Sequence, residues 1–210
     1  MSAADRPKAD NPFSACCIRP GAIRYLFPEG QCVAGLLERL QAEGWWGQIL
    51  GAHGTGKSAL LATLIPAIEQ SGRAALLIEL HDGARRLPRG LEQLAGLSPG
   101  TVVIIDGYEQ LSRWSRWRVK RFCRQRRLGL LVTAHRSVGL PLVSRTESSL
   151  ALAQRLIGQL SPDCASWVSQ QELQERYALH GGNLRELLFD LYDRYERHHR
   201  QDGTGPDWAV

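Results

Sequence analysis

The sequence has no apolar run long enough to cross a membrane. A transmembrane helix needs roughly 18 consecutive apolar residues, and polar or charged residues interrupt every apolar stretch of this chain before that length. Residues 1–17, MSAADRPKADNPFSACC, also lack the apolar segment that a secretory signal peptide requires. Both absences predict a cytoplasmic protein.

Cysteine is scarce and poorly spaced for structural roles. The five cysteines are odd in number and form no C-x-x-C pair, and the six histidines do not cluster with cysteines or carboxylates at ligand spacing. These patterns argue against a disulfide framework and against a zinc site. The sequence also lacks internal repeats and low-complexity segments, so one domain with a small appendage is expected for its 210 residues.

Short apolar runs alternate with helical patterns along most of the chain. The expected strands are 47–50, 75–80, 101–106, 128–134 and 140–146. The expected helices between them are roughly 33–43, 57–70, 91–95, 109–126 and 148–160. The alternation predicts an α/β fold, in which a parallel sheet has helices on both faces. Pro66, inside the second expected helix, predicts a kink or an early end there.

The two ends and the C-terminal part differ from this central region. Residues 1–18 are polar and interrupted by proline, which predicts a flexible N-terminal arm, and residues 201–210 predict a flexible tail. From residue 169 onward the pattern becomes helical, and the expected N-caps there are Ser169 and Asn183. We therefore expect a sheet-containing core over 19–160 and a small helical lid over 161–200.

Residues 51–58, GAHGTGKS, fit the phosphate-binding loop pattern G-x-x-x-x-G-K-[ST]. The segment lies between an expected buried strand and an amphipathic helix, where glycines leave backbone N–H groups free to surround a polyphosphate. Lys57 would reach the β- and γ-phosphates, and the Ser58 hydroxyl would ligate Mg²⁺. The expected nucleotide-binding residues are Gly51, His53, Gly54, Thr55, Gly56, Lys57, Ser58 and Ala59.

Polar residues follow two further expected strands. Asp106 ends the apolar run TVVIID, where a carboxylate would orient Mg²⁺. Glu109 is the next acid and the candidate for activating the attacking water, although an acid in a first helical turn explains it equally well. In LLVTAHR, Thr133 and Arg136 would contact the γ-phosphate or position water from the same sheet edge. His135 is expected to be structural.

Residues 113–127, RWSRWRVKRFCRQRR, hold eight basic residues and no acid. At helical spacing they predict a basic stripe of Arg113, Arg116, Lys120, Arg124 and Arg127. The side chains expected to pack inward are Trp114, Val119 and Phe122. The stripe would meet a nucleic-acid backbone or an acidic protein surface, or it is simply a solvated face. Trp114 and Trp117 could stack on bases, but core packing is the favoured interpretation.

Together, GAHGTGKS, VVIIDGYE, LLVTAHR and HGGNLRE resemble, in order and spacing, the motifs of AAA+ and STAND-type ATPases, which belong to the additional-strand class of P-loop proteins. DGYEQL is similar to a NACHT-type magnesium motif, with Gln110 where a second acid is expected and Gly107 where many related ATPases have glutamate. GGNLRE is similar to the sensor-2 segment of origin-recognition-type AAA+ proteins. The resemblance therefore implies that Arg185 reaches the γ-phosphate from a helical lid.

The favoured hypothesis is an ATPase that binds ATP and Mg²⁺, hydrolyses slowly and acts as a nucleotide-dependent conformational switch on a parallel P-loop NTPase sheet. Two alternatives stay open: a non-hydrolysing, nucleotide-gated binding or scaffold module that associates with DNA, and a small-molecule phosphotransferase that uses HDGARRLPRG (81–90) for an anionic acceptor. The sequence contains neither the N-K-x-D guanine reader of GTPases nor the L-S-G-G-Q signature of transporter-type ATPases.

Overall fold

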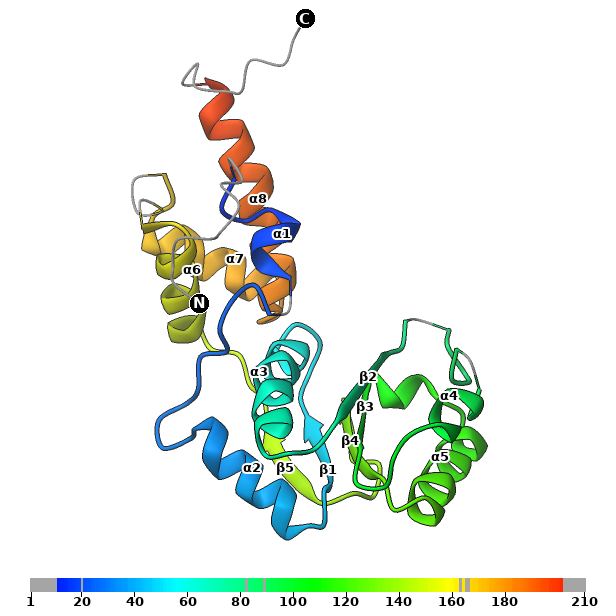
Figure 1. Cartoon of the computed structure of the whole chain (residues 1–210). Helices are drawn as coiled ribbons and strands as arrows, with labels where there is room; N and C mark the ends of the chain where they lie inside the picture. The colour runs from blue at the N-terminus through cyan, green and yellow to red at the C-terminus, as the bar shows by residue number, and fades with distance from the viewer. Residues whose placement is uncertain are drawn as a thin grey trace, which may run out of the picture. The chain divides into compact units, whose positions relative to one another are not determined.

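The computed structural model describes residues 11–19, 21–81, 83–88, 90–162, 164 and 167–201. The chain divides into two compact units, Phe27–Glu147 and the combination of Met1–Leu26 with Ser148–Val210. We call the first the sheet unit and the second the helical unit (Figure 1). Each unit has its own cluster of buried apolar side chains, so each is described by itself.

The sheet unit is built on a five-stranded sheet in which every strand pair is parallel. The strands are β1 (Trp46–Leu50), β2 (Ala75–Glu79), β3 (Val102–Asp106), β4 (Gly129–Ala134) and β5 (Leu142–Arg145). Their order is β2-β3-β4-β1-β5, which places β4 between β1 and β3. The apolar residues of β3 and β4 are fully buried, as expected for central strands that are covered on both faces.

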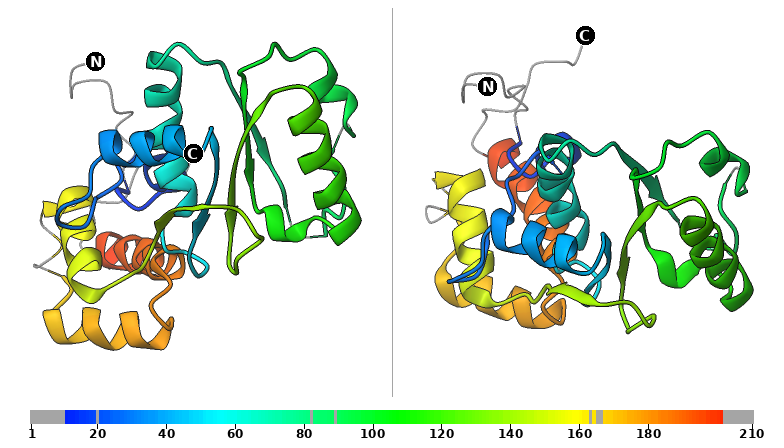
Figure 2. Two further views of the ribbon diagram at one scale, coloured as in Figure 1. Left: turned by 90° about the horizontal axis from the view of Figure 1, so that it is seen from below. Right: turned by 60° about the horizontal axis from the view of Figure 1, so that its bottom comes forward.

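Helices cover both faces of this sheet (Figures 1 and 2). On one face lie α2 (Val33–Ala42) and α3 (Lys57–Gln70), and on the other lie α4 (Glu92–Ala95) and α5 (Arg113–Gln125). The stripe of α3 that is buried comprises Leu60, Leu61, Leu64 and Ile68. The predicted α/β fold, with a parallel sheet between two helical layers, is confirmed.

The helix α3 runs through Pro66 and ends only at Gln70, so the early end that this proline suggested does not occur. Proline removes the N–H that would bond to the carbonyl of Ala62. Pro66 is exposed, and Leu64 and Ile68 on either side of it are buried. Apolar packing therefore holds the last turn of the helix, and the lost hydrogen bond lies away from the core.

The expected helix over 109–126 is two separate elements. A short 3-10 helix, η1 (Tyr108–Gln110), follows β3, and α5 begins afresh at Arg113. Ser112 is the N-cap of α5, where its hydroxyl accepts a hydrogen bond from the Ser115 amide at 3.1 Å. This break matters for the site because it holds Glu109 in its own turn, outside the long helix.

The rotation of α5 differs from the predicted basic stripe. Arg116 and Lys120, which were expected to face outward, are half-buried and donate to main-chain carbonyls. Trp114, which was expected to pack inward, is 62% exposed. The buried side of the helix is Ser115, Val119 and Cys123. Because these three repeat at four-residue spacing from the capped first turn, they set the phase of the helix. The predicted stripe is therefore wrong at Arg116 and Lys120, whereas Arg113, Arg124 and Arg127 are exposed as predicted.

The helical unit contains α1 (Ala15–Ile18), α6 (Leu150–Leu160), α7 (Gln170–Leu179) and α8 (Leu184–Gln201). Both predicted N-caps are confirmed: the Ser169 hydroxyl accepts from the Glu172 amide at 3.2 Å, and the Asn183 side chain accepts from the amides of Arg185 and Glu186. The carboxylate of Glu172 forms ion pairs with Arg176 and Arg194. It thereby joins α7 to α8.

The boundaries of the units differ from the predicted ones. The helical unit begins at Ser148, so α6 belongs to it and not to a core that ends at residue 160. Part of the expected arm over 1–18 is packed: Phe13 is fully buried, and its ring meets Trp167 edge-on at a centroid distance of 5.9 Å. Asn11 donates to the main-chain carbonyl of Tyr192 at 3.1 Å. The N-terminal segment thus completes the helical core.

The five cysteines are free thiols. Burial raises the pKa of the Cys123 thiol to about 12 and that of Cys164 to about 11. Both thiols are therefore protonated at neutral pH and poor nucleophiles. Among the residues that the structure describes, no helix combines the length and apolarity needed to cross a membrane.

Replacing Phe13 with alanine should lower the free energy of unfolding by about 3–5 kcal/mol, because it removes a fully buried ring from the helical core. Urea denaturation followed by circular dichroism measures this loss. Phe189→Ala is the matched control, since Phe189 lies on α8 with 46% of its surface exposed, and should cost no more than about 1 kcal/mol. Equal losses in the two variants would contradict the placement of Phe13.

Candidate functional site

The loop between β1 and α3 is shaped by glycines that no other residue can replace without strain. A Cβ atom on Gly51 would lie 2.1 Å from Thr146 Oγ1 and 2.6 Å from the Thr146 carbonyl oxygen, well inside contact distance. Gly54 and Gly56 have φ angles of 70° and 92°, in the left-handed region that favours glycine. The chain therefore turns directly into the N-terminus of α3, where free amide groups attract anions.

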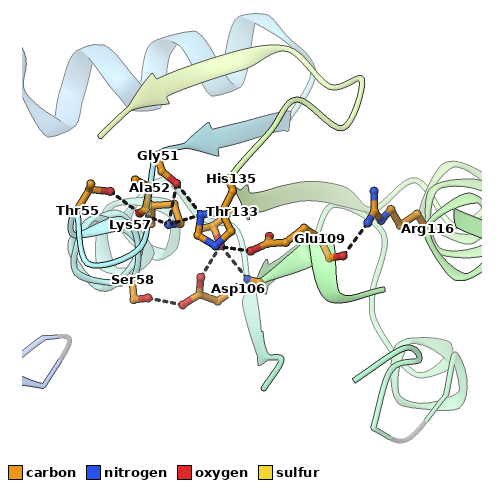
Figure 3. Close-up of polar contacts among 11 residues, drawn as sticks. Gly51, Ala52, Thr55, Lys57, Ser58, Asp106, Glu109, Arg116, Thr133 and His135 are labelled. Atoms are coloured by element: carbon orange, nitrogen blue, oxygen red, sulfur yellow. Dashed lines mark hydrogen bonds and ion pairs between the residues drawn. The ribbon is translucent and has the colours of Figure 1, made fainter. Parts of the chain in front are cut away.

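Lys57, the first residue of α3, points back into this loop (Figure 3). Its side chain is buried, and Nζ donates to the carbonyl oxygens of Gly51 at 2.9 Å and Ala52 at 2.7 Å. Thr55 Oγ1 also donates to the Ala52 carbonyl at 2.9 Å and shares a 2.7 Å hydrogen bond with Thr146 Oγ1. One ammonium group is thus held at the centre of a closely bonded loop.

Asp106, at the end of β3, joins the loop to the neighbouring strands. Ser58 Oγ donates to Asp106 Oδ2 at 2.5 Å, and Thr133 Oγ1 donates to Asp106 Oδ1 (Figure 3). The Thr133 hydroxyl accepts in turn from the Gly107 amide at 2.8 Å. The carboxyl ends of β1, β4 and β3 are neighbours in the sheet, which is why residues far apart in sequence meet here.

The pair Ser58 and Asp106 suits a magnesium ion. Mg²⁺ prefers hydroxyl, carboxylate and water oxygens and is commonly held by only one or two protein groups. Here a hydroxyl and a carboxylate oxygen lie within hydrogen-bonding distance of each other, at the N-terminus of a helix. This donor set fits the predicted metal site.

Glu109 lies in η1 with its two carboxylate oxygens in different environments. Oε1 is 2.8 Å from His135 Nε2. Oε2 is buried and has no hydrogen-bond partner among the residues that the structure describes. A buried acceptor without a partner is costly in a folded protein. Oε2 is therefore the carboxylate oxygen of Glu109 that has no partner within the protein's described residues.

His135 is the functional residue that sequence reasoning missed. Its Nδ1 lies 2.9 Å from the Gly51 carbonyl oxygen, its Nε2 faces Glu109, and its ring stacks on His53 at a centroid distance of 3.7 Å. His135 Nδ1 also lies 3.4 Å from Lys57 Nζ, so one imidazole contacts the loop, the lysine and Glu109. A signal was present in the sequence, since residues two apart on an extended chain share a face and Thr133 was already a candidate.

The remaining predicted residues lie less centrally. Ala59 is half-buried in the first turn of α3, and His53 is exposed with its ring against His135. Arg136 is exposed and takes part in none of the hydrogen bonds or ion pairs that the described residues form around Asp106. Arg185 lies in the first turn of α8, in the helical unit, with its side chain exposed. The roles expected for Arg136 and Arg185 stay predictions.

Comparison with known proteins identifies the fold. No family model matches the chain, and no curated protein sequence matches it. Its structure is similar to that of RuvB from Thermotoga maritima. A threonine-to-valine RuvB variant gives a TM-score of 0.54 at 14% identity, covering 84% of this chain and 64% of RuvB. A RuvB structure described as a Holliday junction branch migration motor gives 0.52 at 15% identity, covering 80% and 62%.

This chain therefore spans slightly less than two thirds of the RuvB chains that it matches. At such low identity the likeness concerns the fold alone, and it shows that the chain has the parallel α/β P-loop NTPase fold of these RuvB structures. The order of the strands agrees with this result, because β4 stands as an additional strand between the loop strand β1 and the aspartate strand β3.

Thr133→Val should destabilise the sheet unit by about 2–4 kcal/mol, because valine leaves Asp106 Oδ1 and the Gly107 amide without the hydroxyl that both use. Thr133→Ser keeps that hydroxyl and loses only a buried methyl group, at a cost of about 1 kcal/mol. Chemical denaturation of both variants and the wild type tests the difference. A valine variant as stable as the serine variant would rule out the bridging role of Thr133.

Proposed function

We propose that this chain is an ATPase module that binds ATP with Mg²⁺ and acts as a nucleotide-dependent conformational switch, with slow hydrolysis. The observation that carries the proposal is the hydrogen-bonded set of Ser58, Asp106 and Thr133 directly beside a loop that holds Lys57. A glycine-rich turn with a surface lysine would need none of these partners. A triphosphate with its metal would use Ser58, Asp106 and Lys57 directly, with Thr133 holding Asp106 in place.

Different residues of the site would bind the phosphates and the metal. The loop amides and Lys57 would hold the β- and γ-phosphates, the amides as fixed dipoles and the ammonium as a point charge. Ser58 and Asp106 would hold Mg²⁺, which neutralises charge on the phosphate oxygens. Thr133 is fully buried and already bonded to Asp106. We therefore assign Thr133 to positioning Asp106, in place of the direct phosphate contact that its strand-end position suggested.

Glu109 is proposed to orient and deprotonate the attacking water through Oε2. His135 holds the other oxygen and contacts the Gly51 carbonyl of the loop, so it fixes the direction in which Oε2 points. Two features favour slow turnover. Gly107 stands where many related ATPases have the glutamate, and Glu109 is instead presented from η1, with Gln110 in place of a second acid.

Arg185 is proposed as the residue that reports the γ-phosphate to the helical unit. Its position at the capped start of α8 leaves the guanidinium exposed, while Leu184, Leu187 and Leu188 of the same helix are buried in the helical core. A contact made by Arg185 would therefore act on the whole unit rather than on one mobile side chain. The role of Arg185 is supported by the similarity of GGNLRE to the sensor-2 segment. Together with the NACHT-like DGYEQL, this similarity supports our proposal that the chain is related to the AAA+ and STAND-type ATPases.

Lys57→Ala should weaken ATP binding at least about tenfold, because it removes the charge-assisted hydrogen bonds of the only ammonium in the loop. Titration with a fluorescent ATP analogue in the presence of magnesium measures the affinity. Lys120→Ala is the matched control: Lys120 also donates to a main-chain carbonyl, of Val138 at 2.6 Å, but lies on α5. Equal affinities of Lys57→Ala and the wild type would refute the nucleotide site.

Glu109→Gln should bind ATP within about threefold of the wild type and hydrolyse it about 100-fold more slowly, since the amide cannot accept the proton of water. Phosphate release without any added acceptor measures turnover and also separates an ATPase from a phosphotransferase. Glu92→Gln, an exposed acid in the first turn of α4, serves as the control. An unchanged rate for Glu109→Gln would remove Glu109 from the mechanism.

A further inference from the structure

The outward surface of α5 carries two tryptophans that the fold does not bury. Trp114 is 62% exposed and Trp117 is 57% exposed, although tryptophan is usually largely buried in folded proteins. Arg118 and Arg121 lie on the same side, because positions 114, 117, 118 and 121 follow the helical repeat. We call these four residues the indole face.

The indole face is preorganised by contacts within the helix. The Arg118 guanidinium carbon lies 4.6 Å from the centre of the Trp114 ring, and that of Arg121 lies 5.9 Å from the Trp117 ring. Both distances are in the range of cation–π attraction. Each indole is thus paired with a cation whose N–H groups remain available to an anion.

The helix beneath this face is firmly anchored. Arg116 donates to the carbonyl oxygens of Leu111 at 2.8 Å and Glu109 at 2.7 Å, and Lys120 donates to that of Val138 at 2.6 Å. Val119 and Cys123 are buried against the sheet. The inward basic residues therefore serve the fold, and the outward tryptophans and arginines need another explanation.

Positive charge along α5 has no acidic counterpart. Residues 113–127 contain eight basic residues and no acid, and none of the ion pairs formed by the described residues involves this segment. Burial, together with the charges of Arg124 and Arg116, lowers the pKa of Lys120 below its usual value. Unbalanced charge of this kind repels itself and is relieved by a polyanion.

We propose that the indole face binds single-stranded nucleic acid. Arginines without acidic partners suit the phosphates of a strand, and adjacent exposed indoles suit its bases, which stack on aromatic rings irrespective of sequence. Bases in a duplex are stacked on one another, so their faces are out of reach of Trp114 and Trp117. Protein interfaces are also enriched in tryptophan and arginine, so an acidic protein surface is the competing occupant that the test below must separate from a nucleic acid.

The test is binding of a fluorescein-labelled oligothymidylate of about 20 nucleotides, long enough for one site, to the full chain, followed by anisotropy between about 50 and 200 mM salt. Trp114→Ala/Trp117→Ala should weaken binding about tenfold or more, because the variant cannot stack bases on indole rings. Arg118→Ala/Arg121→Ala should weaken binding and flatten the slope of log K against log salt by about 1.4, since each phosphate that an arginine neutralises on a single strand adds about 0.7 to that slope.

Two control variants sit away from α5. Arg39→Ala removes an exposed arginine of α2, and Phe189→Ala removes an exposed aromatic ring of α8. Both should bind the oligonucleotide as the wild type does, and circular dichroism should show all variants folded. Oligouridylate in place of oligothymidylate separates RNA from DNA, and tight binding of either strand supports the proposal.

Four results would overturn it. They are no binding even at low salt, a tryptophan double variant that binds as tightly as the wild type, stronger binding to duplex than to single strands, and equal competition by a polyglutamate peptide. The last result would identify α5 as a docking surface for an acidic protein. Nucleotide binding at Lys57 is measured separately, so none of these results bears on the ATPase proposal.

Discussion

The geometry of the site depends on two hydroxyl groups that donate hydrogen bonds to one carboxylate. Ser58 approaches Asp106 from the helix after the loop, and Thr133 approaches it from β4. The Thr133 bond joins the ends of the neighbouring strands β4 and β3, and the Ser58 bond joins the start of α3, the helix that follows β1, to the end of β3. A carboxylate that is shared in this way cannot rotate freely, and its oxygens stay directed towards the start of α3.

The same edge of the sheet explains why Glu109 and His135 belong to the site. His135 follows β4, Glu109 follows β3, and Gly51 follows β1, so the imidazole connects the segments after all three strands through its two ring nitrogens. Glu109 thereby has one oxygen committed and one unpaired. The difference between the two carboxylate oxygens arises from the fold, because the short helix η1 separates β3 from α5 and holds Glu109 beside His135.

The sequence was sufficient to predict the parts of the molecule that follow local rules. Strands β1 to β4, the glycine loop, Asp106 at a strand end and the caps Ser169 and Asn183 all carry short-range signals, either apolar runs or a polar atom at a fixed offset. Features decided by long-range packing were missed. Nothing near Phe13 indicates that its ring will pack against Trp167 and Tyr195, which are more than 150 positions away in the sequence. The boundary at Ser148 likewise depends on long-range packing.

The helix α5 shows that sequence periodicity alone does not determine which side of a helix is exposed. Its dense arginines suggested one outward stripe, but an arginine or lysine can lie along the protein and donate to a carbonyl, as Arg116 and Lys120 do. Only the capped start at Ser112 fixed which side was buried, and a one-residue error there rotates every side chain by about 100°. Arg116 also ties this helix to the main chain of Glu109. A displacement of α5 would therefore also displace the turn that carries Glu109.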